Sequence, residues 1–136
     1  MADAGMELVE RLYTAFNRRD AEDIVAVCDE AMEFFPYETA GQVGREAPYV
    51  GREGLREYLA DAAQVWEELL VTPSQVDQIG DQLLVRGRVY VHSKELGIRD
   101  MPAAWIWSVR DGLFVRGEVF PNPSAAEEQF AQLTVV

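Results

Sequence analysis

The sequence has 136 residues, which is enough for one domain of ordinary size and too few for a second independent core. Hydrophobic residues make up 49% of the chain, a fraction that supports a buried core and excludes intrinsic disorder. The formal net charge of -12 would repel nucleic-acid phosphates and anionic lipid headgroups. We therefore expect a single domain over residues 1–136, with neither nucleic acid nor membranes as partners.

Composition also bears on where the protein works. No stretch approaches the roughly 18 to 20 apolar residues of a membrane span, and the first twenty residues do not have the pattern of a signal peptide. Cys28 is the only cysteine, so an internal disulfide is impossible. These features predict a cytoplasmic protein. The strong preference for arginine over lysine, together with abundant alanine and valine, favours a bacterial source.

Helical periodicity dominates the first half of the chain. Residues 3–18 carry an apolar stripe with spacings of three and four, formed by Val9, Leu12, Tyr13 and Phe16. The same spacing predicts helices over residues 21–28, where Cys28 completes the stripe, and over residues 52–69. Between these helices, residues 32–38 are rich in aromatics and are stopped by Pro36, which predicts a short edge strand followed by a loop.

The second half changes to strand-like sequence. β-branched and aromatic residues are concentrated at 76–79, 83–92, 103–109 and 113–120. The Asp111-Gly112 pair between the last two stretches is a strong signal for a tight hairpin. The tail beyond Pro123 is expected to add a short helix or to fray. Helices followed by a meander of strands predict an α+β fold, because alternating βαβ units are absent.

Several motifs give this order of elements a family resemblance. They are Asn17-Arg18-Arg19-Asp20 at the end of the first helix, Gly51-Arg52-Glu53-Gly54 at the start of the third, Asp111-Gly112 in the hairpin and Val119-Phe120-Pro121 at the end of the last strand. With them, nearly the whole chain resembles the SnoaL-like branch of the nuclear transport factor two-like superfamily. The resemblance implies a cone-shaped α+β barrel, in which a curved antiparallel sheet wraps around the N-terminal helices and leaves a pocket at its wide end. Members include polyketide cyclases, ketosteroid isomerase, dehydratases, epoxide hydrolases and proteins without known activity, so the motifs specify fold better than function.

The catalytic residues of ketosteroid isomerase do not carry over to this chain. That enzyme needs a carboxylate base and an oxyanion hole made of a tyrosine and a protonated aspartate. The matching positions here hold Leu12, Phe35 and Trp105. Tyr13 lies next to the tyrosine position but about 100° away around the helix. Steroid-type isomerisation is therefore disfavoured.

For the polyketide-cyclase pattern, an acid/base aspartate assisted by a histidine, the nearest candidates are Glu118 and His92. Strict alternation along residues 113–120 places Glu118 on the same face as Phe114 and Phe120. If that face lines the pocket, Glu118 is a candidate general acid/base beside aromatic rings. If it is the outer face, Glu118 is the partner of an arginine such as Arg116.

Other candidate residues concern ligand binding. Tyr13 or Tyr37 could donate a hydrogen bond to a developing oxyanion. Aromatic lining is typical of pockets for flat apolar ligands, although core packing explains the same residues. The candidate lining residues are Phe16, Phe35, Tyr37, Tyr58, Trp66, Trp105, Trp107 and Phe120.

Metal ions and cofactors are not expected. The single histidine, His92, lacks the neighbouring ligands of a metal site and alternates with polar residues on one strand face. Cys28 is most simply a small core residue. No glycine-rich phosphate motif with a following lysine is present.

Two classes of function follow. The first is an enzyme that transfers protons on a small hydrophobic molecule without a cofactor, with Glu118 as the acid/base and Tyr13 as a donor. The second is a non-catalytic ligand-binding or interaction module of the same fold. In both cases the row formed by Arg86, Arg88, Tyr90 and His92 is predicted to face outward and to meet its own copy in a homodimer.

Overall fold

The computed structural model describes residues 2–120 and 122–134, so Pro121 of the last motif lies outside the described part. Within these residues the chain forms helices around a single six-stranded sheet. The helices are α1 (Ala2–Arg18), α2 (Ala21–Ala26), α3 (Tyr37–Gln42), α4 (Gly51–Val65), α5 (Pro123–Ala131) and the 3-10 turn η1 (Gln132–Thr134). The strands are β1 (Cys28–Pro36), β2 (Tyr49–Val50), β3 (Glu68–Ile79), β4 (Gln82–Ser93), β5 (Gly97–Arg110) and β6 (Leu113–Phe120).

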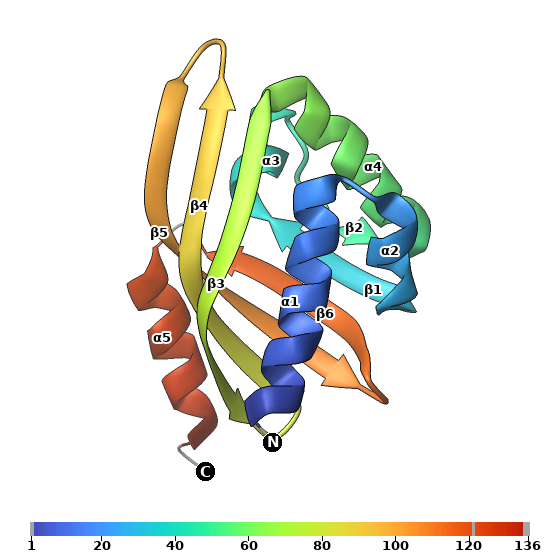
Figure 1. The fold of residues 1–136 in the computed structure, drawn as a ribbon, viewed down its shortest axis with the longest axis vertical. Helices are drawn as coiled ribbons and strands as arrows, with labels where there is room; N and C mark the ends of the chain where they lie inside the picture. The colour runs from blue at the N-terminus through green and yellow to red at the C-terminus, as the bar shows by residue number, and fades with distance from the viewer. Residues whose placement is uncertain (1, 121, 135–136) are drawn as a thin grey trace.

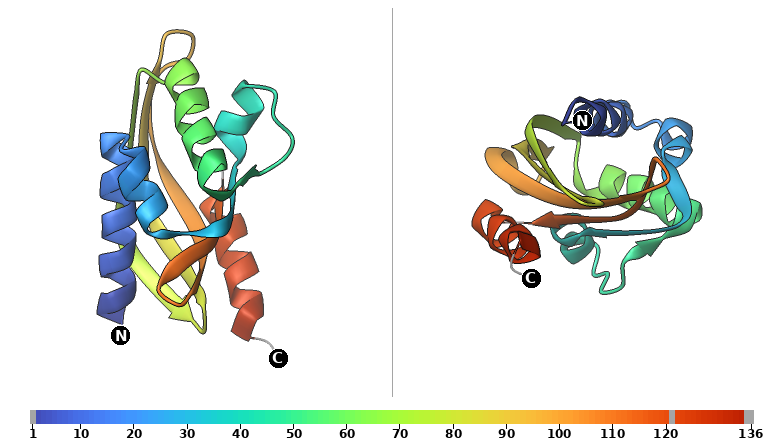
Figure 2. Two further views of the ribbon diagram at one scale, coloured as in Figure 1. Left: turned by 90° about the vertical axis from the view of Figure 1, so that its right-hand side faces the viewer. Right: turned by 90° about the horizontal axis from the view of Figure 1, so that it is seen from below.

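The sheet is curved and open, with the strand order β2-β1-β6-β5-β4-β3. All neighbouring strands are antiparallel except β1 and β6, which run parallel. Figures 1 and 2 show α1 and α4 on one side of the sheet and α5 on the other. The predicted α+β class with N-terminal helices is confirmed. The predicted antiparallel barrel is corrected to a mixed sheet that does not close.

The two faces of the sheet contribute to different cores. The concave face and helices α1, α2 and α4 bury the larger cluster, whose biggest side chains include Trp107, Tyr13, Tyr49 and Phe114. On the convex face, α5 covers a smaller cluster of Leu84, Ala104, Ile106, Phe120, Ala126 and Phe130. The C-terminal helix, one of the two predicted outcomes for the tail, therefore has a packing role.

Local sequence explains how the elements begin and turn. Asp20 caps α2 by accepting a hydrogen bond from the backbone N–H of Asp23 at 3.2 Å. Asn122 accepts one from the backbone of Ser124 at 2.9 Å and caps α5 in the same way. Asp111 and Gly112 have φ values of 54° and 77°, the left-handed conformation that a two-residue hairpin turn between β5 and β6 requires.

The region around β1 differs most from the sequence-based expectation. Cys28 begins β1 instead of ending a helix, although it is buried as expected. β1 is an interior strand between β2 and β6, because the two-residue strand β2 forms the sheet edge. The segment after Pro36, predicted as a loop, forms α3. Pro36 removes a backbone donor and ends the strand, as predicted, but its fixed φ is also compatible with the start of a helix.

The other sheet edge, β3, is longer than expected and begins at Glu68, where the third helix was predicted to continue to residue 69. Pro73 lies within this strand, and its register shifts between Pro73 and Gln75. An edge strand tolerates proline because its free side needs no ladder hydrogen bonds. The Asn17 side chain, at the end of α1, pairs with the backbone of Val71 on β3, donating to its carbonyl at 2.9 Å and accepting from its N–H at 2.8 Å.

Candidate functional site

The concave face of the sheet and the helices above it enclose a cavity of about 90 Å³. Most of the lining is apolar or aromatic, and it comes from every strand except the edge strand β2. The predicted candidates among the lining residues are Tyr13, Phe16, Tyr58, Trp66, Trp105, Trp107 and Phe120. Glu38 and Pro102, which are exposed, mark the place where the cavity meets solvent.

Trp107 organises the inner end of the pocket. Its indole N–H donates to the hydroxyl of Tyr13 at 2.9 Å, and its ring lies parallel to that of Phe34 at 5.8 Å. Gly117 on β6 lies opposite Trp107, and a Cβ atom there would come within 2.2 Å of the indole ring. The ring can therefore lie against the sheet only because residue 117 has no side chain.

Tyr13 is a buried hydrogen-bond donor in this pocket. Burial raises the pKa of Tyr13 well above its ordinary value, and the hydrogen bond from Trp107 opposes part of that shift. The phenol therefore keeps its proton. Among the hydrogen bonds of the described residues, the Tyr13 hydroxyl accepts from Trp107 and donates to no partner. Its O–H remains available for a ligand, and accepting a hydrogen bond strengthens a hydroxyl as a donor.

A second polar group lies between α3 and α4. The indole N–H of Trp66, the C-cap residue of α4, donates to the Thr39 hydroxyl at 3.0 Å. Burial raises the pKa of Tyr58 to about 12, opposed by a hydrogen bond with Thr39 and by the charge of Arg19. These neutral groups fix the positions of two aromatic rings that line the pocket.

An ion pair spans the rim of the pocket. The carboxylate of Glu38, on α3, pairs with Nη2 of Arg99 on β5. The Arg99 guanidinium also lies 5.8 Å from the centre of the Trp66 ring. Both charged side chains are more than a third exposed, so the pair contributes at most about 1 kcal/mol and opens easily.

Glu118 does not line this pocket. It lies opposite Ile106, a residue of the convex cluster, and directly paired residues share a face of a sheet. Its carboxylate accepts a hydrogen bond from the Tyr37 hydroxyl at 2.8 Å and lies 3.4 Å from Arg116. Glu118 is buried, but it lies on the outer face and is paired with Arg116. This is the second of the two arrangements that the sequence left open.

An irregularity in β6 explains why strict alternation misleads here. The register between β5 and β6 shifts between Ser108 and Val109, so Phe114 pairs with Val109 while Arg116 pairs with Ser108. Val115, between them, has no paired residue on β5. Phe114 therefore faces the concave core, where its ring contacts Trp107. Phe114 and Glu118 therefore do not share a face, contrary to the alternation pattern.

Phe35 and Tyr37 also lie away from the pocket lining. Phe35 pairs with Glu118 across the β1–β6 ladder, and the Arg116 guanidinium lies 4.6 Å from its ring centre. Burial, followed by the hydrogen bond to Glu118, raises the pKa of Tyr37. Phe35, Tyr37, Arg116 and Glu118 thus form one convex-face group.

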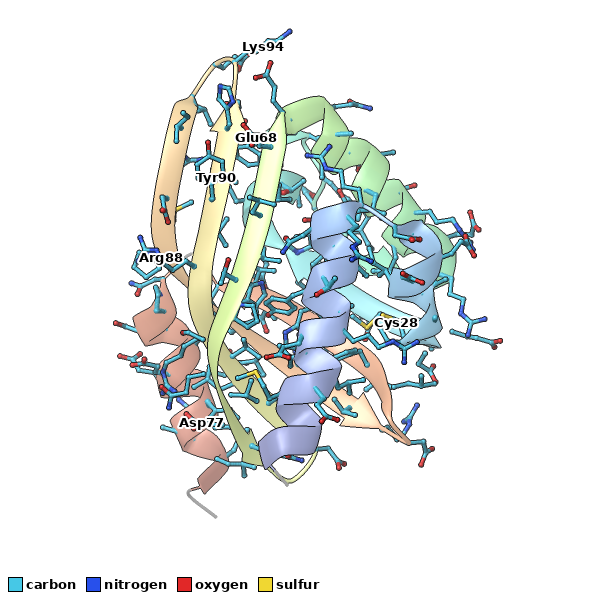
Figure 3. The ribbon with its side chains drawn as sticks, viewed as in Figure 1. Cys28, Glu68, Asp77, Arg88, Tyr90 and Lys94 are labelled. Atoms are coloured by element: carbon cyan, nitrogen blue, oxygen red, sulfur yellow. The ribbon has the colours of Figure 1, made fainter. Side chains whose placement is uncertain are left out.

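The predicted outward row on β4 has partners within the chain. Arg86 contacts Asp77 and Glu127, and Arg88 contacts Asp100 at 2.9 Å. Figure 3 shows Tyr90 on the upper part of β4 and Arg88 lower on the same strand, just above the upper end of α5 in this view. His92 lies 3.4 Å from Glu67 and 3.6 Å from Glu68 and is outside the pocket lining.

Within the described residues, no group of three or more His, Cys, Asp or Glu side chains is arranged to hold a metal ion. Over the same residues, no helix has the length and apolar character needed to cross a membrane.

Sequence reasoning missed the polar residues of the rim. Glu38 and Thr39 belong to a segment predicted as strand end and loop, and only its short helix brings them to the pocket. Arg99 precedes the range predicted for its strand. An alternation running back from Trp107 and Trp105 through Ala103 and Met101 would have placed Arg99 on the inner face.

Comparisons with solved structures show how widely this architecture occurs. TerC, co-crystallized with polyporic acid, is 26% identical, with a TM-score of 0.78 over 92% of this chain and 96% of that one. A nuclear transport factor two-like protein of unknown function from Burkholderia pseudomallei is 17% identical, with a TM-score of 0.78 over 92% and 95% of the two chains. A candidate polyketide cyclase from Pseudomonas putida is 18% identical, with a TM-score of 0.69 over 90% and 95%. The last two similarities concern the fold alone.

The search of curated proteins gave no match. The family model of the SnoaL-like domain matches residues 9–117, a range that runs from α1 to β6 and includes most of the pocket lining. The chain therefore belongs to the SnoaL-like domain family.

Proposed function

We propose that this protein binds a small, mostly apolar ring molecule in the concave pocket, with the Tyr13 hydroxyl donating to an oxygen of that molecule. The observation that carries the proposal is a buried O–H that lines an aromatic cavity and donates to no described partner. Such a pocket, apolar with few polar groups, suits small organic ligands. TerC, a protein of the same fold with 26% identity, was crystallized with polyporic acid, which supports a small-molecule role.

The size of the cavity limits how a ligand can enter. A cavity of about 150 Å³ accepts benzene, whereas this one measures about 90 Å³. A ring ligand therefore requires side chains to move. The Glu38–Arg99 pair at the rim opens at little cost, and Met101 in the lining is a flexible side chain that adapts to new shapes.

The three tryptophans of the chain provide a direct test, because all of them line the pocket. Titration with phenol, which carries one oxygen, should shift their indole N–H signals in NMR spectra. Tyr13→Phe should weaken phenol binding by about tenfold, the value of one buried hydrogen bond. Tyr37→Phe, on the convex face, is the matched control and should leave binding unchanged. Indole signals that do not respond to phenol would refute the pocket proposal.

Proton-transfer catalysis is the second candidate function. Among the described lining residues, Glu38 is the carboxylate that shares the cavity with Tyr13, whereas Glu118 lies on the convex face. Catalysis should accelerate exchange of the acetophenone methyl protons with D₂O, which NMR measures directly. Glu38→Gln should abolish that exchange if Glu38 is the base, and Glu118→Gln should abolish it if the originally predicted acid/base acts. Exchange at the uncatalysed rate supports a binding protein.

We also propose that two copies associate through the part of the convex face that α5 leaves open. Leu70 and Ile98 are exposed there, 44% and 63%, beside alternating charges such as Arg88 and Asp100. A surface that mixes both signs of charge with apolar side chains can be complementary to its own two-fold copy. Because Arg88 already has an acidic neighbour, Asp100, in its own chain, two such rows can approach with the charge of each Arg88 balanced.

A further inference from the structure

Arg99 lies beside the rim of the pocket, in contact with the lining residues Glu38 and Trp66, with its side chain on the concave face. Along β5 it has the same parity as Met101 and Ala103, which line the pocket. Its cross-strand partner is Val91, which is also a lining residue. The guanidinium lies beside the Trp66 ring and is bound to Glu38 through Nη2. The Nη2 end of the guanidinium is therefore held by an acidic partner, Glu38.

The Nε–H of the same guanidinium has no partner. Among the described residues, Arg99 Nε is the buried side-chain nitrogen or oxygen atom without a hydrogen bond. Leaving a buried donor unsatisfied costs stability, and such groups are uncommon in native proteins. An acceptor supplied by a bound molecule at the rim would remove that cost, because Nε–H is free while Nη2 holds Glu38.

We propose that Arg99 is a specificity-determining residue, whose Nε–H donates to a neutral acceptor oxygen, such as a ketone carbonyl, on the ligand. This inference rests on the proposed ligand pocket and adds the class of molecule that the pocket selects. A carboxylate is disfavoured at this position, because Glu38 lies on the same guanidinium and the chain has a net charge of -12.

Arg99 and Tyr13 serve different parts of the pocket. Tyr13 packs against Trp105, with ring centres 5.0 Å apart, and Trp105 is six residues along β5 from Arg99. At about 3.3 Å per residue, six residues span about 20 Å of strand. A single small ring cannot use both donors, so an experiment on Arg99 must first remove the donor at Tyr13.

The test compares three probes in a Tyr13→Phe background: acetophenone, ethylbenzene and benzoate. They share one ring and differ in a carbonyl, no polar group or a carboxylate, and the Trp66 indole signal beside Arg99 reports binding. We expect acetophenone to bind about tenfold more tightly than ethylbenzene. Adding Arg99→Met should bring the two affinities to within about twofold by weakening acetophenone alone. Arg99→Lys, which keeps the charge without the fork, should also lose most of the preference.

Each alternative outcome has a definite meaning. An acetophenone preference that survives Arg99→Met overturns the assignment of Arg99, while the binding of ethylbenzene would still support the pocket. If none of the probes shifts the indole signals, both proposals fail. Because the methionine variant also releases Glu38, near-UV circular dichroism should confirm that its fold is intact.

Glu38→Gln sharpens the test through the charge of the ligand. Benzoate should bind more weakly than acetophenone before this change and should gain about tenfold after it, since the repelling carboxylate is gone while Arg99 remains. If the ion pair were purely structural, its loss would not change the affinity for benzoate relative to that for acetophenone. Benzoate that binds as tightly as acetophenone to the protein with Glu38 intact would overturn the neutral-oxygen assignment.

Discussion

The concave and convex faces of the sheet carry polar groups of different kinds. Inside the concave pocket, neutral donors and acceptors such as Tyr13 and Thr39 lie among aromatic rings, and the charged Glu38–Arg99 pair is at the rim. On the convex face, charged groups pair with one another, as Arg116 does with Glu118 and Arg86 with Asp77. Glu118 is nearly as buried as several pocket residues, yet it belongs to the charged side. Burial alone therefore does not identify the residues of the site. The face of the sheet on which a residue lies separates the pocket residues from Glu118.

Truncating a ring on each face should give the largest effects and separate stability from binding. Trp105→Ala removes a ring that is 3% exposed and should lower the free energy of unfolding by about 3 kcal/mol. Phe130→Ala, in the convex cluster, should also destabilise the protein but leave phenol binding unchanged. Denaturant unfolding and the phenol titration measure the two effects. A Trp105→Ala midpoint close to that of the wild type would mean that this ring contributes little to the core.

Adding a single carbon opposite Trp107 should have the next largest effect. In Gly117→Ala the new Cβ overlaps the indole ring, and such overpacking costs about 1–3 kcal/mol. The Trp107 indole signal should also shift. Gly41→Ala is the matched control, because a Cβ atom added at this position in α3 would have no atom within 4 Å. There the change should raise stability, since alanine is favoured over glycine inside a helix by about 1 kcal/mol. Equal stability of the two variants would contradict the close contact at Gly117.

Alkaline pH should weaken the concave core through Cys28. Burial raises the pKa of the Cys28 thiol to about 12, and the charge of Arg52 opposes the shift. The unfolded thiol loses its proton first, near a pKa of about 8.5, so this stabilisation is complete at lower pH and is lost as pH rises toward 12. The slope should approach about 1.4 kcal/mol per pH unit.

Cys28→Ala isolates this contribution. Between pH 8.5 and 9.5, where unfolded tyrosines with a pKa of about 10 are still mostly protonated, the variant should show a clearly flatter decline than the wild type. Urea unfolding at closely spaced pH values measures the difference. Parallel curves for the two proteins would show that the thiol is not desolvated.

The smallest effect on chain stability is expected for the open part of the convex face. Light scattering of the wild type should give about twice the 15.3 kDa chain mass. The double change Arg88→Glu, Tyr90→Asp should shift that mass toward the monomer and alter the unfolding free energy of the chain little, since exposed ion pairs contribute about 0–1 kcal/mol. Arg110→Glu, at the exposed end of β5, should leave the mass unchanged. A monomeric wild type at micromolar concentration would contradict the dimer.

Regular patterns in the sequence predicted the fold well. Helical spacing located α1 and α4, and the Asp111-Gly112 pair identified the hairpin between β5 and β6. Alternation along β4 also holds, because Val85 and Val91 are buried in the concave core while Arg88 is exposed. These signals are local, and each arises from a backbone geometry that only some residues satisfy.

The predictions that failed depend on contacts far apart in sequence. One irregular pairing in β6 reverses the face of Phe114 relative to Glu118, and nothing in the composition of that strand marks it. The partners of Glu118 include Tyr37, which is 81 residues away. Likewise, the sequence indicated that some aromatic residues line a pocket but not which ones. Phe34 and Phe35 are adjacent, and of these two only Phe34 reaches the pocket.

The pairing of Asn17 with Val71 has a consequence for behaviour at high protein concentration. An open sheet has two edges, and an unpaired edge strand can recruit another chain into intermolecular β-aggregates. Here the amide of Asn17 occupies one N–H and one C=O of β3, and Pro73 lacks the donor that a foreign strand would need. The opposite edge, β2, is only two residues long. The sheet thus remains open enough for a ligand while neither edge offers a long template for misassembly.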